Sequence, residues 1–65
     1  MSELEIERRR REQGVSIAEL CVQAQIAYSR AWHGLRGTRL SAEELRRLDR
    51  AMTAIEQHNR LSPVA

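Results

Sequence analysis

The sequence predicts an all-α fold, a compact bundle of four to five helices in a single domain over residues 1–65. No segment alternates apolar and polar residues as a half-buried strand does. The chain also has only 3 glycines and lacks the Asn-Gly and Asp-Gly pairs of hairpin turns. Helices are predicted directly by the pattern Ser-x-x-Glu, which occurs at Ser2, Ser16 and Ser41. In this capping box, serine and glutamate side chains bind the backbone N–H groups that a helix start leaves free.

The first helix is expected to run from about Glu3 to Gln13. It should stop at Gly14, because glycine readily adopts the left-handed backbone that follows many helices. Its apolar face is poor, since few aliphatic residues precede a run of four arginines at positions 8–11. Some of those arginine stems are therefore expected to lie along the core while their charged heads reach water.

Two short helices should follow in close succession. One begins after Ser16 and ends near Ala24, and the next runs from about Ala27 to Leu35. Two short helices joined by about three residues are typical of a helix-turn-helix, which we place at about residues 17–36.

The last helix is the longest and is predicted to span about residues 42–59, ending before Ser62-Pro63. Its apolar residues follow a helical three-four-three spacing, and this stripe is longer than a thin bundle needs to cover. The second half of the helix is therefore a candidate dimer contact, with burial against the first helix as the alternative reading. The residues of this candidate contact are Ala51, Met52, Ile55 and Leu61.

The composition argues against an enzyme and favours a binding module. One cysteine, Cys21, allows no internal disulfide, and its place on an apolar helix face favours a small buried residue over a redox sensor. His33 and His58 lie far apart without partner ligands, so we expect no metal and no cofactor. No set of nucleophile, base and orienting group can be assembled, and no apolar run is long enough for a membrane span or a secretory signal.

The net charge of +2 conceals a basic segment. Between Glu19 and Glu43 there is no acidic residue, and Arg30, Arg36 and Arg39 all fall in that interval. All 11 basic residues of the chain are arginines. The planar donor fork of arginine suits phosphates and guanine edges, although a bias in the coding sequence would explain the absence of lysine equally well.

Several stretches of the chain share a spaced pattern with one known family. They are residues 10–16, 19–21, 26–30, 35–39 and 41–52. Together they resemble the phage-repressor and Cro (XRE-type) helix-turn-helix family over roughly residues 6–55. The resemblance implies a DNA-binding domain whose third helix enters the major groove.

The sequence departs from this family's pattern at four places. Gln25 stands where the turn usually has glycine, and Cys21 replaces a customary alanine. Arg9 occupies a position at which the first helix normally buries a leucine. In the third helix, Ala31 and Gly34 replace branched aliphatic residues, so Trp32 could turn inward to fill the space instead of facing DNA.

If Ala31 and Gly34 face inward, helix geometry turns another set of side chains outward, where they would meet base edges. These expected base contacts are Tyr28, Ser29, Trp32, His33 and Arg36. The expected phosphate contacts flank them and are Arg10, Ser16, Arg30, Thr38 and Arg39. Arg10 corresponds to a family position that often contacts the backbone of DNA.

The sequence thus predicts a transcriptional regulator that binds double-stranded DNA sequence-specifically, as a homodimeric repressor on an inverted-repeat operator. It would be a bacterial or phage-encoded protein of the cytoplasm, associated with the nucleoid when bound. The alternative is a small protein-interaction module (an adaptor, a phage inhibitor or an antitoxin) that uses the same face on a protein partner. Exposed tyrosine, tryptophan and arginine are typical of both.

Overall fold

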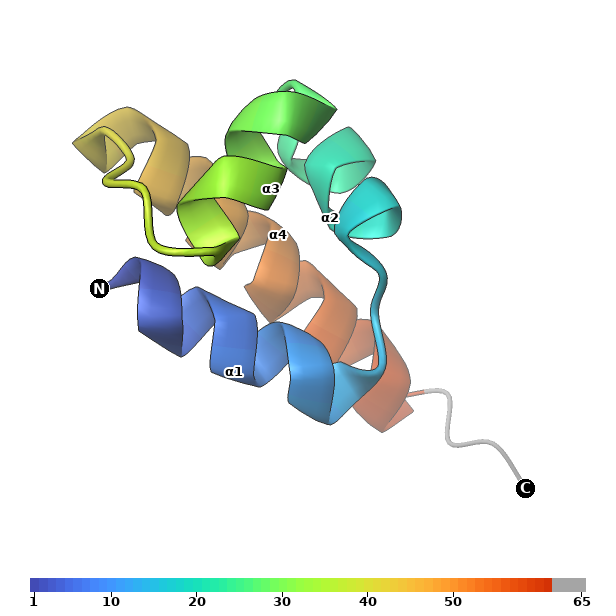
Figure 1. Ribbon diagram of the computed structural model, residues 1–65. Coiled ribbons are helices and arrows are strands. Elements are labelled where there is room, and N and C mark those ends of the chain that lie inside the picture. The colour runs from blue at the N-terminus through green and yellow to red at the C-terminus, as the bar shows by residue number, and fades with distance from the viewer. Residues whose placement is uncertain (62–65) are drawn as a thin grey trace.

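The computed structural model describes residues 1–61, which form four α-helices and no strand. In chain order they are α1 (Glu3–Gln13), α2 (Ile17–Ala24), α3 (Tyr28–Leu35) and α4 (Ala42–Leu61). The long helix α4 packs against both α1 and α2, and α3 packs on α1 and α2 (Figure 1). The predicted all-helical bundle is confirmed for these residues, with four helices.

The helix starts follow the predicted capping pattern. Each of the three capping serines accepts a hydrogen bond from the backbone N–H three residues later, at 3.0–3.2 Å. At Ser41 the return bond also forms, because the Ser41 N–H donates to Glu44 Oε1 at 2.9 Å. Of the three predicted capping boxes, this is the one that is reciprocal within residues 1–61.

The helix ends agree with the expected bounds to within two residues. α1 ends at Gln13 and is capped by Gly14 with φ of 67°, as predicted. α2 ends at Ala24 and is capped by Gln25, whose φ of 57° makes it the one non-glycine residue with positive φ in the described chain. α3 begins at Tyr28, one residue later than expected, and α4 continues two residues further, to Leu61.

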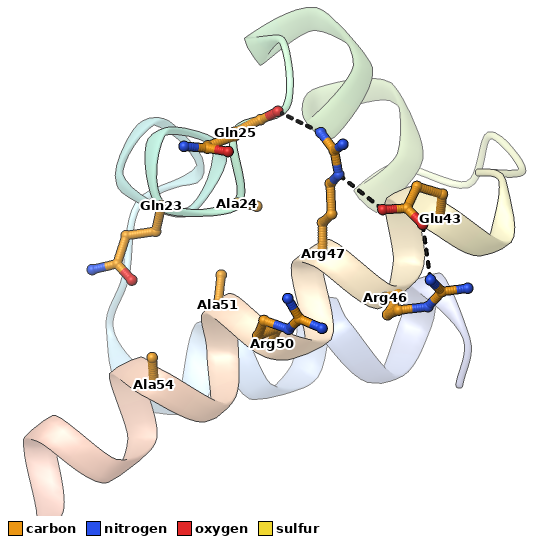
Figure 2. Close-up of a pocket in the computed structure, with 9 residues that line it drawn as sticks. All are labelled: Gln23, Ala24, Gln25, Glu43, Arg46, Arg47, Arg50, Ala51 and Ala54. Atoms are coloured by element: carbon orange, nitrogen blue, oxygen red, sulfur yellow. Dashed lines mark hydrogen bonds and ion pairs between the residues drawn. The ribbon is translucent and has the colours of Figure 1, made fainter.

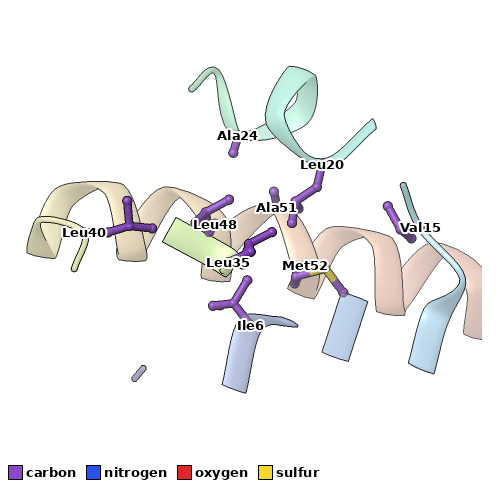
Figure 3. Close-up of a cluster of buried hydrophobic side chains, with 9 residues drawn as sticks. All are labelled: Ile6, Val15, Leu20, Ala24, Leu35, Leu40, Leu48, Ala51 and Met52. Carbon is purple, nitrogen blue, oxygen red and sulfur yellow. The ribbon is translucent and has the colours of Figure 1, made fainter. Parts of the chain in front are cut away.

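The core lies where α1, α2 and α3 meet α4 (Figure 3). Its largest fully buried side chains are Ile6, Leu20, Leu48 and Met52. α1 contributes Ile6 alone as a buried residue, in keeping with its poor apolar face. Cys21 is also buried, and its Sγ donates to the carbonyl of Ala18.

The candidate dimer contact is wrong in two of its four residues. Met52 is completely buried and Ala51 is 5% exposed, because α1 and α2 pack over this part of α4. The alternative, burial within the domain, therefore holds for both. Ile55 is half-buried against the same core, and Leu61 is exposed.

An ion-pair cluster around Arg9 joins α1 to α4. The Arg9 guanidinium donates to Asp49 Oδ1 at 2.8 Å, to both Glu56 oxygens at 2.8 and 2.9 Å and to Thr53 Oγ1 at 3.2 Å. These bonds raise the pKa of Arg9 and lower that of Glu56. Arg9 thus uses its charge to hold the two helices together.

Candidate nucleic-acid interface

The helix α3 has one buried face and one exposed face. Ala31, Gly34 and Leu35 lie against the rest of the domain. The five side chains expected to face outward are all exposed: Tyr28, Ser29, Trp32, His33 and, directly after the end of α3, Arg36; Arg30 is exposed as well. We call these five residues the α3 face.

The small residues of α3 let the following segment pack unusually close. A Cβ atom added to Gly34 would lie less than 3.0 Å from three carbons of the Leu40 side chain. Leu40 is itself buried, so it fills the space that a branched residue at position 34 would take. Trp32 is therefore not needed in the core.

Trp32 and Arg36 form a stacked pair on the α3 face. The Arg36 guanidinium carbon lies 4.7 Å from the centre of the Trp32 ring, a cation–π arrangement. The His33 ring meets the same indole edge-on at 5.1 Å. Trp32 is 36% exposed and Tyr28 52%, so the two aromatic residues of the chain both reach the surface here.

The loop after α3 is fixed beside this face by two hydrogen bonds. The Thr38 N–H donates to the His33 carbonyl at 3.0 Å, and the Leu40 N–H donates to Glu3 Oε2 at 2.7 Å. The second bond is the main cause of the lowered pKa of Glu3. Thr38 and Arg39 are exposed between these anchors.

Two of the arginines predicted to contact phosphates form ion pairs with carboxylates of the domain. Arg10 donates to both Glu7 oxygens, at 2.7 and 2.8 Å, and to the Val15 carbonyl at 2.7 Å. This guanidinium is thus bonded within the domain at the end of α1, and a phosphate contact for it stays a prediction. Arg30 donates to both Glu44 oxygens at 2.8 and 2.9 Å, a pair that lowers the pKa of Glu44 to about 2.

Because Arg30 is paired with Glu44, fewer basic side chains of the acid-free segment are left without an ion pair. Within residues 1–61, Arg36, Arg39 and His33 have no ion pair with a carboxylate. Ser16 is exposed at the start of α2, where its Oγ accepts the capping bond from Glu19. The sequence could not reveal the partner of Arg30, because Glu44 lies outside the acid-free segment and meets it only in the fold.

A second group of arginines lines a hollow between the end of α2 and α4 (Figure 2). Arg46 and Arg47 both donate to Glu43, and Arg47 also donates to the Gln25 carbonyl at 3.2 Å. Arg50 has no such bond in the described chain. Sequence reasoning missed this group, although the spacing of these residues along one helix is a signal for it.

Within the described residues, no group of three or more His, Cys, Asp or Glu side chains could hold a metal ion. None of the helices over residues 1–61 combines the length and apolar character that crossing a membrane requires. No protein-family model, curated protein or solved structure matches this chain.

Proposed function

We propose that this protein binds double-stranded DNA sequence-specifically, with α2 and α3 acting as a helix-turn-helix and α3 entering the major groove. The observation that carries the proposal is the α3 face, where hydrogen-bonding and aromatic side chains surround Arg36, which has no ion pair with a carboxylate of residues 1–61. A major groove about 12 Å wide accepts one helix and presents base edges to its exposed side chains.

The electrostatics around α3 support a polyanionic partner. Within residues 1–61 no side chain caps the start of α3 at Ala27, so its first N–H groups remain available to phosphate oxygens. Arg39 and Thr38 lie exposed beyond the other end of α3 and would contact the DNA backbone. Phosphates would therefore position the helix, and the α3 face would read the bases.

Each polar residue of the α3 face has a distinct expected role. Arg36 carries the donor fork that pairs with guanine, and Ser29 and His33 can donate to base acceptors or accept from base donors. Tyr28 and Trp32 offer apolar surface to thymine methyl groups and sugars. The stacking on Trp32 restricts the Arg36 side chain before it binds.

A small domain that contacts few bases gains specificity by pairing. We propose a homodimer on an inverted repeat, with half-sites about 34–36 Å apart and repression by occupying a promoter. Burial of Met52 removes the middle of α4 from such a contact. Ile55 and Leu61, toward the end of the helix, remain available for it.

The test is selection of bound duplexes from a random pool, followed by anisotropy titrations at several salt concentrations. We expect an enriched, palindromic sequence and affinity that falls steeply as salt rises, because arginines displace counterions from phosphates. Arg36→Ala should weaken binding to the selected site by about 1–3 kcal/mol and relax the preference at one base pair. Failure of the wild-type chain to bind any duplex at low salt would refute the proposal.

Arg50→Ala is the matched control for Arg36→Ala. Both residues are exposed arginines without a carboxylate partner in the described chain, but Arg50 lies on α4 in the hollow of Figure 2. Its removal should leave base preference unchanged. An equal effect of both substitutions on all duplexes would show that Arg36 acts only through its charge.

The second candidate function is a protein-interaction module that uses the same α3 face. The observation in its favour is the exposed group of Tyr28, Trp32 and Arg36, residue types that dominate binding energy at protein interfaces. A stoichiometric protein partner lost on Trp32→Ala, together with no salt-dependent DNA binding, would select this function over the first.

A further inference from the structure

A shallow hollow lies between α1 and α3 and shares one residue with the α3 face. It is lined by Leu4, Glu7, Arg8, Arg11, Leu35 and Arg36. Three arginines and one glutamate give it a surplus of two positive charges. Arg36, the last of the five residues of the α3 face, forms part of its wall. The hollow therefore continues the α3 face onto the neighbouring helix.

The one carboxylate among the described residues of this hollow, that of Glu7, is already bonded to arginines of α1. Glu7 accepts two bonds from Arg10 and one from Arg11, the last at 2.9 Å. These bonds hold the pKa of Glu7 below its ordinary value, so the carboxylate stays ionised and bound. Arg8 and Arg36 have no carboxylate partner among residues 1–61, and both are exposed. Their guanidinium groups are thus available to a ligand.

The apolar part of the hollow is uncovered on one side. Leu4 is 79% exposed on α1, whereas Leu35 belongs to the buried core. An exposed leucine between two guanidinium groups is chemically complementary to a polymeric ligand in which apolar and anionic units alternate. The sugar–phosphate backbone of DNA has this alternation, with deoxyribose carbons between charged phosphates.

We propose that this hollow binds a phosphodiester of the DNA strand beside the major groove that α3 enters, with Arg8 and Arg11 donating to it while Arg36, in the wall of the hollow, contacts the neighbouring base. This inference rests on the proposed function, since it takes duplex DNA as the ligand. It adds a contact that the basic segment of the sequence does not contain, because Arg8 and Arg11 belong to the arginine run of α1.

The arginines on α4 do not make the same site. Arg46 and Arg47 share Glu43, and Arg47 is also bound to the end of α2 (Figure 2). No residue of the α3 face lines that hollow. A duplex centred on α3 would therefore meet the hollow at α1 and not the one at α4.

The experiment compares two double variants that remove equal charge. Arg8→Ala/Arg11→Ala deletes one arginine that has no carboxylate partner within residues 1–61 and one that is paired with a glutamate. Arg46→Ala/Arg50→Ala deletes the same combination on α4, since Arg46 pairs with Glu43. Binding to a mixed-sequence 24-base-pair duplex is followed by anisotropy as a function of salt, and circular dichroism checks that each variant is folded.

The logarithm of affinity should depend less steeply on the logarithm of salt concentration in the α1 variant. Each lost phosphate contact reduces this slope by about 0.9, so a reduction of about 0.9 to 1.8 is expected. The α4 variant should keep the wild-type slope. Arg8→Ala alone should reduce the slope by about 0.9 and cannot disrupt the domain through lost hydrogen bonds, because the Arg8 side chain makes none within residues 1–61.

Equal slopes in the two double variants would overturn the inference while the proposed function stands, because wild-type binding is measured in the same series. Absence of salt-dependent binding by the wild-type chain would overturn both. The alternative that an acidic protein occupies this hollow is tested with polyglutamate as the ligand. Binding of that peptide that requires Arg8 and Arg11, with duplex binding unchanged in the α1 variant, would also overturn the inference.

Discussion

Gly34 determines how closely the loop after α3 approaches that helix. Glycine inside a helix is unfavourable by about 1 kcal/mol relative to alanine, so a second effect must favour it here. That effect is the Leu40 side chain, which occupies the space a Cβ would need. Because the Leu40 N–H is also bound to Glu3, the close approach fixes Thr38 and Arg39 beside the α3 face.

Gly34→Ala should therefore destabilise the domain despite its gain in helix propensity. Overpacking of a filled site costs about 1–3 kcal/mol, which exceeds the propensity gain. Urea denaturation should show a lower free energy of unfolding. In a Leu40→Ala background the sign should reverse, with Gly34→Ala raising the free energy of unfolding by about 1 kcal/mol, since only the propensity remains. The same cost in both backgrounds would contradict this explanation.

At the scale of single elements, the end of α2 carries backbone strain, because Gln25 has a positive φ without being glycine. Gln25 adopts a left-handed backbone, and its N–H bonds to the carbonyls of Cys21 and Val22 at the end of the helix. A residue with a Cβ pays about 1–2 kcal/mol for this conformation, whereas glycine adopts it freely. The turn between α2 and α3 thus holds Gln25 in a backbone conformation that glutamine does not favour.

Gln25→Gly should raise the free energy of unfolding by about 0.5–1 kcal/mol, because the relief of strain exceeds the added entropy of the unfolded chain. The Arg47 bond at this position is made to the backbone carbonyl, so it survives the change. Gln23→Gly is the control. Gln23 is exposed within α2, where glycine should lower the free energy of unfolding by about 1 kcal/mol. The measurement is the melting temperature of each variant. If Gln25→Gly and Gln23→Gly shifted it in the same direction, the strain at Gln25 would be contradicted.

The elements were largely predictable because their signals are local. Capping serines, Gly14 and the helical spacing of apolar residues depend on neighbours within one or two turns. The outward set on α3 was predictable for the same reason, once Ala31 and Gly34 were taken as buried. At Gln25 the sequence showed only that a glutamine stands where such a turn usually has glycine, and the structure adds that it adopts the left-handed backbone.

What could not be predicted depends on which helices meet. The spacing of apolar residues in α4 predicts that Met52 is buried, but it does not show which surface buries it. A domain core and a dimer contact therefore give the same sequence pattern. Arg9 and Arg10 belong to one run, yet Arg9 bonds across to α4 and Arg10 bonds within its own end of the chain. Ion pairs between residues 14 or more positions apart, such as Arg30 with Glu44, carry no sequence signal at all.

At the scale of the whole molecule, carboxylates join its parts. Glu3 holds the loop after α3, Glu44 joins α4 to α3, and Glu56 joins α4 to α1. Each accepts a hydrogen bond as an anion, which lowers its pKa from the ordinary value of 4.5. Exposed ion pairs contribute little singly, so this stabilisation is spread over several groups.

The domain should consequently lose stability in acid. A carboxyl group with a lowered pKa in the folded state stabilises it above pH 4.5, and that contribution disappears as pH falls through the folded value. For Glu44 this loss spans the interval from 4.5 down to about 2. Denaturation series across this interval should show a steady decrease in the free energy of unfolding. Glu44→Gln should make the decrease shallower, whereas Glu12→Gln, at an exposed side chain without a partner in residues 1–61, should not.

The ion-pair cluster of Arg9 has a consequence for how the chain folds as it is synthesised. Its bonds join residues 40 and 47 positions apart, and α1 has only Ile6 to bury on its own account. The bonds that join α1 to α4 can therefore form only after residues 49–56 of α4 have left the ribosome. Until then α1 has only its contact with α3 to pack on.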